Sequence, residues 1–255
     1  MTPKTVFYQD PLHDDFAGTH IATKALPADF RYVRTNPLWR AAGQTIYRVA
    51  QLIAFLFRKV WCCQHFENKD CLRAVRGRGA YVYANHTQGV MDAFLPCQLR
   101  FPGQSFIVVG PDALSIPLLQ NLVQMLGAIP LGSTMAQSRE MTRCVHKRVA
   151  DGNLVTVYPE AHIWPYYTGI RPFPDHSFGY PARDGAPVYA MTSCYQKRPF
   201  GKRPKVITFL DGPFFPDMDL PLPQRKQKLR QQCHDAMVKR TEAYSTYRFY
   251  EYKKA

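Results

Sequence analysis

The pattern of hydrophobic and polar positions changes its period near residue 79. Between residues 37 and 67, apolar side chains recur at helical spacing. Asn36 suits the cap of that helix, and Pro37 suits its first turn. After residue 79, short apolar runs alternate with helical patterns. These runs predict strands at 80–86, 105–110, 128–131, 154–160, 186–195 and 205–214, and helices at 89–99, 115–126, about 134–150 and about 223–247.

The alternation of strands and helices sets the expected fold class. It is typical of an α/β protein with a largely parallel central sheet flanked by helices. We divide the chain into an irregular segment at 1–36, an amphipathic helical segment at 37–67 and one domain at 68–255. No internal repeat or low-complexity linker is visible in the sequence. Functional side chains in such a fold lie beyond the carboxyl ends of the strands.

The segment at 45–63 comes nearest to a membrane span. It contains no window of 18 apolar residues, and Arg48, Arg58 and Lys59 flank its apolar run. An apolar middle with basic and aromatic ends suits a helix that lies in a membrane interface. The same pattern fits a core helix of a soluble domain. The residues leave both interpretations open, and 37–67 is therefore a candidate membrane-interface anchor.

Net charge and cysteine content narrow the choice of partner and compartment. The chain of 255 residues has 33 Lys and Arg against 19 Asp and Glu, a net charge of +14. This excess favours an anionic partner: nucleic acid, a membrane surface, or a phosphorylated or coenzyme-bound substrate. Seven scattered cysteines argue against a disulfide framework, and no secretory signal is visible. These features indicate a reducing location that faces the cytosol.

A histidine and an aspartate follow the first predicted strand of the domain, in the sequence ANHTQGVMD at 84–92. His86 would be held at the end of a buried strand, and histidine suits proton abstraction near neutral pH. Asp92 would orient the imidazole and stabilise its charged form if Gly89 lets the loop fold back. Taken alone, such a pair is more often a loop histidine followed by the N-terminal aspartate of a helix.

A second polar cluster follows the strand at 154–160, in the sequence VYPEAHIWPYYTGIRPF. Glu160 suits a hydrogen bond to a substrate hydroxyl or an ion pair with a basic residue of the site. Arg171 suits bidentate binding of a phosphate. Glu160 and His162 have the spacing of two metal ligands, but no third ligand is identifiable, so we expect no metal. Glu160, His162 and Arg171 are therefore candidate substrate-binding residues.

These motifs, in this order, resemble those of the glycerolipid acyltransferases, the lysophosphatidate (1-acylglycerol-3-phosphate) acyltransferase-type enzymes. NHTQGVMD matches the first motif and VYPEA the third, with LGAIPLGS at 126–133 and GAPVYAM at 185–191 as the second and fourth. The resemblance covers roughly residues 75–195. It implies that 68–255 is an acyltransferase domain in which His86 deprotonates an acceptor hydroxyl and Asp92 orients His86. The hydroxyl would attack the thioester of acyl-CoA or acyl carrier protein, a co-substrate, and no other cofactor is expected.

The chain departs from the family pattern in the first three of these motifs. Five residues separate His86 from Asp92, where the family has four. In the second motif, well-known members carry an arginine that residues 131–132 do not supply. In the third motif, Ala161 replaces a glycine, and the arginine that follows it in the family is absent. The candidates to hold the acceptor's phosphate instead are Arg139, Arg143, Lys147 and Arg171.

The resemblance also implies partners and a location. We expect a peripheral or monotopic protein of phospholipid biosynthesis on the cytoplasmic side of a membrane, in contact with lipids and with acyl-CoA or acyl carrier protein. Two alternatives remain. One is a non-catalytic membrane- or lipid-binding protein, which the wider His86–Asp92 gap favours. The other is a thioester hydrolase that uses Glu160 and His162. Nucleic acid is not an expected partner, because the sequence has no recognition motif.

Overall fold

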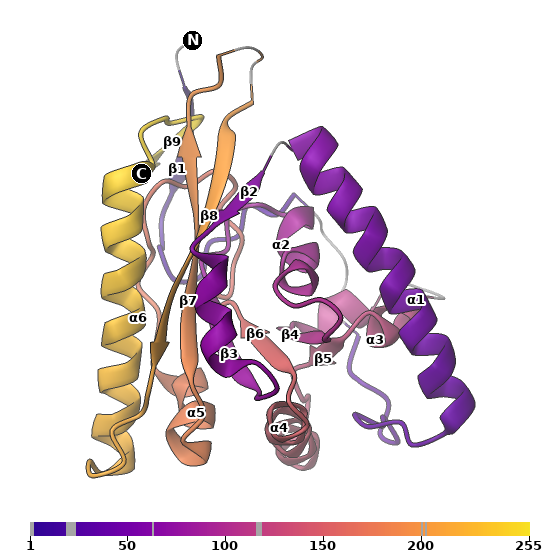
Figure 1. The fold of residues 1–255 in the computed structure, drawn as a ribbon. Coiled ribbons are helices and arrows are strands. Elements are labelled where there is room, and N and C mark those ends of the chain that lie inside the picture. Colours follow the sequence, from indigo (N-terminus) through magenta and orange to yellow (C-terminus); the bar gives the residue numbers. More distant parts are fainter. Residues whose placement is uncertain (1–2, 19–23, 63, 116–118, 200, 202) are drawn as a thin grey trace.

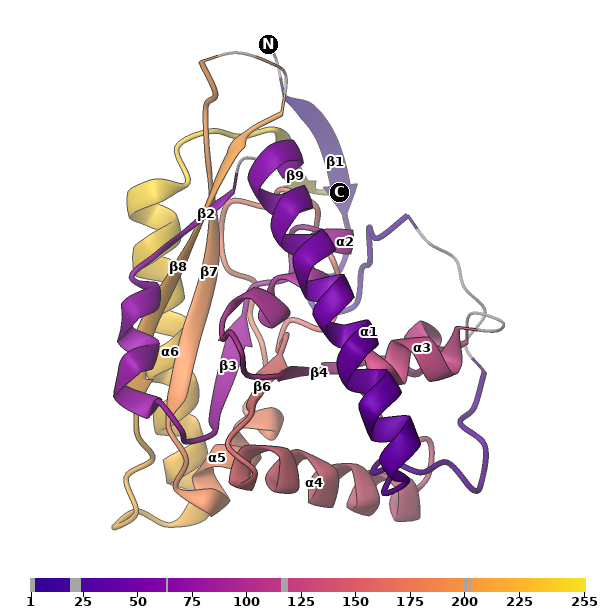
Figure 2. The ribbon, with the colours of Figure 1, turned by 45° about the vertical axis from the view of Figure 1, so that its right-hand side comes forward.

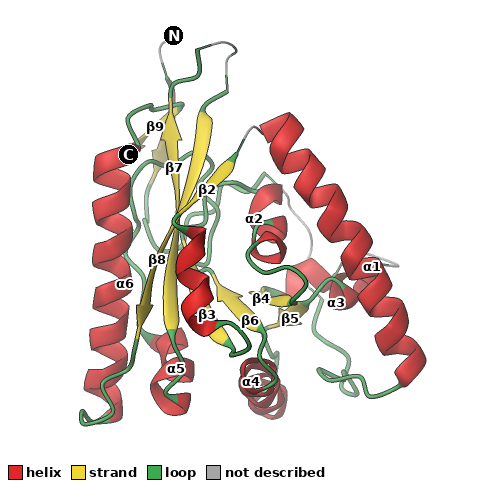
Figure 3. Ribbon diagram, viewed as in Figure 1, coloured by secondary structure: helices red, strands yellow, loops and turns green. Residues whose placement is uncertain are grey.

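A sheet runs through the molecule and carries helices on both faces (Figure 1; Figure 3). This computed structural model describes residues 3–18, 24–62, 64–115, 119–199, 201 and 203–255. Across the sheet, the strands are β2 (His65–Glu67), β8 (Lys205–Phe214), β7 (Val188–Gln196), β3 (Ala80–Ala84), β6 (Leu154–Val157), β4 (Ser105–Val109) and β5 (Ala128–Pro130). β7 and β8 are antiparallel, and the other neighbouring pairs are parallel. The predicted α/β class with a largely parallel sheet is confirmed.

Helices connect the strands and cover the sheet. The α-helices are α1 (Pro37–Leu56), α2 (Val90–Phe94), α3 (Gln120–Met125), α4 (Met135–Ala150), α5 (Gly179–Asp184) and α6 (Leu222–Tyr244). The other helical segments are the π-helix η1 (Phe57–Cys62) and the 3-10 helices η2 (Lys69–Val75), η3 (Pro96–Gln98), η4 (Pro111–Leu114) and η5 (His176–Phe178).

Hydrophobic side chains fill both sides of the sheet, and every residue of its central strand, β3, is buried. Successive side chains of a strand point to opposite faces. Tyr81 and Tyr83 therefore pack with α4, α5 and α6 on one face. Val82 and Ala84 pack with η2 and α2 on the other face. Burial on both faces explains why the strand sequences read as continuous apolar runs.

α6 lies along β7 and β8 (Figure 1). Leu229, Cys233 and Met237 follow one another at a spacing of one helical turn and are buried against the sheet. Arg240, one turn further, pairs with Asp211 of β8 at 2.7 Å. The helix predicted at about 223–247 is present as α6, and it packs on the sheet through this apolar stripe.

Three helices differ in extent from the helices that the sequence pattern predicts. The helix predicted over 37–67 ends as α1 and η1, and its last residues form β2, which pairs with β8. The prediction was wrong for residues 65–67, because pairing with a distant strand overrides local periodicity there. The helix predicted over 89–99 is divided at Pro96 into α2 and η3. Of the helix predicted over 115–126, α3 is present, and 116–118 lie outside the described residues.

The two ends of the chain meet in a second, two-stranded sheet. β1 (Lys4–Tyr8) pairs in parallel with β9 (Tyr250–Lys254). Tyr8, Phe16 and Tyr252 pack their rings around Trp164, in the loop after β6. The prediction that 1–36 is irregular was wrong here, because the pairing partner lies at the other end of the sequence and leaves no local signal.

α1 lies across one side of the molecule, beside α3 and η3 (Figure 2). Asn36 caps it as predicted, since its side-chain oxygen accepts a hydrogen bond from the Leu38 N–H at 2.8 Å. Tyr47, Gln51 and Ala54 form its buried side. The exposed apolar side chains of α1 are Leu38, Val49, Leu52, Ile53, Phe55 and Leu56. In the part of the chain that the structure describes, no helix combines the length and apolar character needed to cross a membrane.

Candidate active site

Two loops meet at the carboxyl edge of the sheet because β3 runs parallel to β6 and β7 on either side of it. The loop after β3 contains His86, and the loop after β6 contains Glu160. Backbone hydrogen bonds join them. The N–H of Trp164 donates to the carbonyl of His86 at 3.1 Å, and that of Tyr166 donates to the carbonyl of Thr87 at 2.8 Å. These hydrogen bonds hold the two loops together at the edge of the sheet where the functional side chains were predicted.

His86 and Asp92 form a hydrogen-bonded pair in the first of these loops. The Nδ1 atom of His86 lies 2.8 Å from Oδ2 of Asp92. The Asp92 side chain is 1% exposed, whereas that of His86 is 16% exposed and open to a ligand. The backbone N–H of Gln88 donates to the same Oδ2 at 2.9 Å. The predicted hydrogen bond between His86 and Asp92 is thus present.

Gly89 lets the loop bridge the five-residue gap, as predicted. Its φ is 56° and its ψ is −120°, a conformation that glycine adopts readily and other residues rarely adopt. The N–H of Met91 donates to the carbonyl of Gln88 at 3.2 Å, and that of Asp92 donates to Gly89 at 3.1 Å. The chain reverses here and enters α2 with Asp92 in its first turn. This reversal returns the carboxylate to His86.

Tyr158 supports both members of the pair, and the sequence analysis did not identify it. Its ring stacks on the His86 imidazole with 4.4 Å between centroids. Its hydroxyl donates to the backbone carbonyl of Asp92 at 2.6 Å. Burial and the nearby Asp92 charge raise the pKa of Tyr158 well above its ordinary value, so it remains a protonated donor. A tyrosine directly after the strand, two positions before Glu160, was the available signal.

The pair has the geometry of a general base and its orienting carboxylate. An imidazole that donates its Nδ1 hydrogen to Asp92 carries its lone pair on Nε2. Among the described residues, Nε2 of His86 has no hydrogen-bond or ion-pair partner. It is free to take a proton from a bound hydroxyl, while Asp92 stabilises the imidazolium that forms.

Glu160 and Arg171 form an ion pair inside the protein. Oε2 of Glu160 lies 3.3 Å from Nη2 of Arg171, and the two side chains are 0% and 1% exposed. Glu160 also accepts the backbone N–H of His86 at 3.3 Å and that of Arg171 at 3.2 Å. Burial raises the pKa of Glu160, and the Arg171 charge opposes that rise. Of the two roles predicted for Glu160, the structure contains the ion pair, which holds the His86 backbone.

The prediction that Arg171 binds a phosphate was wrong. Its guanidinium donates to the backbone carbonyls of Pro11, Glu160 and His162, as well as to the Glu160 carboxylate. Donors that are used inside the protein do not reach a ligand. For the same reason, the buried and paired carboxylate of Glu160 is not placed to serve as the base of a thioester hydrolase.

The other two predicted binding residues are not joined to the pair. His162 is partly exposed, and its Nδ1 lies 4.0 Å from Oδ2 of Asp15. Arg139 is exposed on α4, and no hydrogen bond or ion pair of the described residues ties its guanidinium to the site. Their roles stay predictions. No three His, Cys, Asp or Glu side chains of the described residues gather to hold a metal ion.

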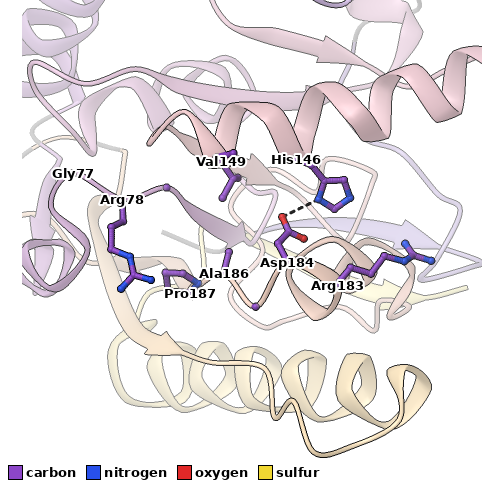
Figure 4. Close-up of a pocket in the computed structure, with 11 residues that line it drawn as sticks. Gly77, Arg78, His146, Val149, Arg183, Asp184, Ala186 and Pro187 are labelled. Carbon is purple, nitrogen blue, oxygen red and sulfur yellow. Dashed lines mark ion pairs between the residues drawn. The ribbon is translucent and has the colours of Figure 1, made fainter.

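A second His–Asp pair lies at the opposite edge of the sheet (Figure 4). Nδ1 of His146, on α4, is 2.8 Å from Oδ2 of Asp184, on α5. The Tyr81 hydroxyl donates to the same oxygen at 2.5 Å. The pair lines a hollow of about 530 Å³ near the amino ends of β3 and β7. This pair makes the same histidine–aspartate contact as His86 and Asp92, but it lies away from the loops that follow the strands. A substitution of His146 is therefore a suitable control for a substitution of His86.

The sheet order and the paired loops define an α/β protein with a largely parallel sheet and polar loops at its carboxyl edge. One solved structure to which the chain is similar is the 1-acyl-sn-glycerophosphate (LPA) acyltransferase PlsC from Thermotoga maritima. The TM-score is 0.58 at 15% sequence identity, over 83% of this chain and 84% of that chain. No protein-family model and no curated protein sequence matches the chain. The likeness therefore establishes a shared fold.

We predict that Arg171→Met lowers the free energy of unfolding by about 3 to 5 kcal/mol near neutral pH, because it leaves the Glu160 charge buried and unpaired. Adding Glu160→Gln should recover part of this loss. Without Arg171, the pKa of Glu160 in the folded protein lies further above its unfolded value. The loss should therefore shrink as the pH falls towards the ordinary carboxyl pKa.

Chemical denaturation of the unaltered protein and of both variants, measured at several pH values, checks this prediction. Equal losses for Arg171→Met and for the double variant, independent of pH, would contradict a buried charge pair at this position.

Proposed function

We propose that the protein transfers an acyl group from an acyl thioester to the hydroxyl of a lysophospholipid or glycerol-phosphate acceptor. The observation that carries this proposal is the His86–Asp92 hydrogen bond at the carboxyl edge of the sheet. The fold shared with a 1-acyl-sn-glycerophosphate acyltransferase supports it. The donor is acyl-CoA or acyl carrier protein, and the reaction belongs to phospholipid biosynthesis.

The reaction uses His86 as a proton carrier. Its Nε2 takes the hydroxyl proton as the acceptor oxygen attacks the carbonyl carbon of the thioester. The new C–O bond forms, the C–S bond breaks, and the proton passes from His86 to the departing thiolate. Asp92 holds the imidazole and stabilises its charged state between these steps. Ester and free thiol are produced, and no acyl group becomes attached to the protein.

An apolar cavity next to α2, the short helix that contains Asp92, suits the acyl chain. It has a volume of about 240 Å³ and lies between α1, α2 and β4. Ala93 and Phe94, which directly follow Asp92, line it together with Tyr47 and Ala50 of α1. A chain seated here is removed from water, which favours its binding in proportion to the apolar area buried.

The exposed apolar side of α1 is suited to bind the membrane that contains both substrates. Val49, Leu52 and Ile53 project from the helix whose inner side covers the acyl cavity. A helix with one apolar side binds in the membrane interface without crossing the bilayer. The net charge of +14 adds attraction to anionic lipid. We therefore infer peripheral or monotopic attachment on the cytoplasmic side.

We predict that His86→Ala lowers acyl transfer by about a hundredfold to ten-thousandfold, the usual contribution of a positioned general base. His146→Ala removes the histidine of the matched pair at the opposite edge and should leave transfer within about twofold of the unaltered protein. Purified proteins are assayed with labelled acyl-CoA and lysophosphatidate.

Two results would contradict this assignment. Full transfer by His86→Ala would mean that another group is the base. Equal losses in His86→Ala and His146→Ala would mean that both act through folding.

Two other outcomes would support the alternative functions. Thioester consumption without acylated lipid would support a hydrolase, and vesicle binding without turnover on any acceptor would support a non-catalytic lipid-binding protein.

We also predict that replacing Leu52 and Ile53 with Glu weakens binding to anionic vesicles by at least about tenfold, because two apolar side chains then leave the bilayer interface. The matched control replaces Phe215 and Met218, which are 56% and 54% exposed in the β8–α6 connection, against 60% and 61% for Leu52 and Ile53. Vesicle flotation measures both variants. Equal binding by both variants would show that α1 is not the membrane-binding surface.

A further inference from the structure

The connection between β7 and β8 carries a concentrated positive charge. Residues 196–205 read QKRPFGKRPK, with five basic side chains and no acidic one. Arg198 ties this connection to the end of η1 by donating to the backbone carbonyl of Cys62 at 2.5 Å. The basic connection therefore lies beside the continuation of the apolar helix α1.

A small cavity of about 70 Å³ adjoins both this connection and the His86 loop. Arg198 and Arg203 line it together with Gln88, Met91 and Tyr166. The described residues that line it include no acidic side chain. The charge of the cavity is thus positive and is not balanced by its own lining, which favours an anionic group there.

Gln88 connects the cavity to the catalytic pair. Its backbone N–H donates to Oδ2 of Asp92 at 2.9 Å. Its side-chain amide donates to the Ser193 hydroxyl of β7 at 2.7 Å, which fixes the side chain. A ligand in the cavity therefore contacts the same residue that holds Asp92, so it lies close to the reacting hydroxyl of an acceptor.

Arg203 has donors available for a ligand. It is exposed, and no hydrogen bond or ion pair of the described residues uses its guanidinium. Tyr166 lines the same cavity as Arg203 and Arg198. Burial raises the pKa of Tyr166, and the charges of the two arginines oppose that rise. A guanidinium with free donors binds a phosphate through two parallel hydrogen bonds.

We propose that Arg203, with Arg198, binds the phosphate group of the acyl acceptor in this cavity. The assignment rests on the proposed function, because it names the binding site for one substrate of that reaction. The small volume fits one phosphate group and not the nucleotide of coenzyme A. It also agrees with the absence of the family's third-motif arginine after Ala161 and with the internal position of Arg171, since the cation comes from the β7–β8 connection instead.

The kinetic test compares two acceptors that differ by the phosphate. With lysophosphatidate, Arg203→Gln raises the KM of the acceptor by about tenfold, the loss expected for one charge-assisted interaction, while kcat stays within about twofold. Arg203→Lys gives a smaller rise because it keeps the charge. Arg203→Gln leaves the KM of monoacylglycerol unchanged, because this acceptor has no phosphate. It also leaves the KM of acyl-CoA unchanged.

Lys197→Gln is the matched control, because Lys197 is an exposed cation of the same connection that does not line the cavity. An equal rise in KM for Lys197→Gln would reduce the effect to surface charge and overturn the proposal. An equal rise on monoacylglycerol, or a rise in the KM of acyl-CoA, would overturn the assignment to the acceptor's phosphate.

A binding measurement separates this proposal from the proposed function. Phenylglyoxal labels exposed arginines, and mass spectrometry locates the label. Glycerol 3-phosphate should protect Arg203 in the unaltered protein and leave Arg139 labelled. This result would stand even if no acceptor were acylated, in which case the transfer reaction would fail alone. Equal labelling of Arg203 with and without glycerol 3-phosphate would overturn the phosphate site.

Discussion

The parallel pairing of β3 with β6 and β7 is the constraint on which the candidate site depends. Because β3 is buried on both faces between these strands, its position and register are fixed. Its carboxyl end therefore delivers His86 beside the loop that contains Tyr158 and Glu160. The antiparallel return of β8 brings a basic connection to the same edge. Strand order thus places the histidine, its carboxylate partner, the stacked tyrosine and the basic connection at one edge.

Two buried carboxylates at this edge are stabilised in different ways. Asp92 is hydrogen-bonded to His86 and to the backbone N–H of Gln88. Glu160 is paired with Arg171 and accepts the N–H of His86. A buried charge without such partners would cost several kcal/mol. Asp92 is paired with a histidine whose side chain is 16% exposed, whereas Glu160 and its partner Arg171 are both sealed inside the protein and hold the backbone of the two loops.

Much of the fold was predictable because its strands are buried and its helices amphipathic, so local periodicity matches the tertiary environment. The bend at Gly89 was predictable for a local reason as well, since the gap between His86 and Asp92 requires a reversal that glycine permits. The pairing of β1 with β9 and the β2 strand depend on residues distant in sequence. The partner of Glu160 depends on how the loop between residues 160 and 171 folds back. Spacing gives no information about such contacts, which is why Arg171 was assigned to a phosphate.

A mass balance of one reaction tests the central claim most directly. Unaltered protein, vesicles, lysophosphatidate and labelled acyl-CoA are incubated together, and free thiol, acylated lipid and free fatty acid are quantified by mass spectrometry. The His86–Asp92 account predicts one acylated lipid for each thiol released, because the acceptor hydroxyl is the nucleophile. Thiol released with an equal amount of free fatty acid, and no acylated lipid, would contradict it.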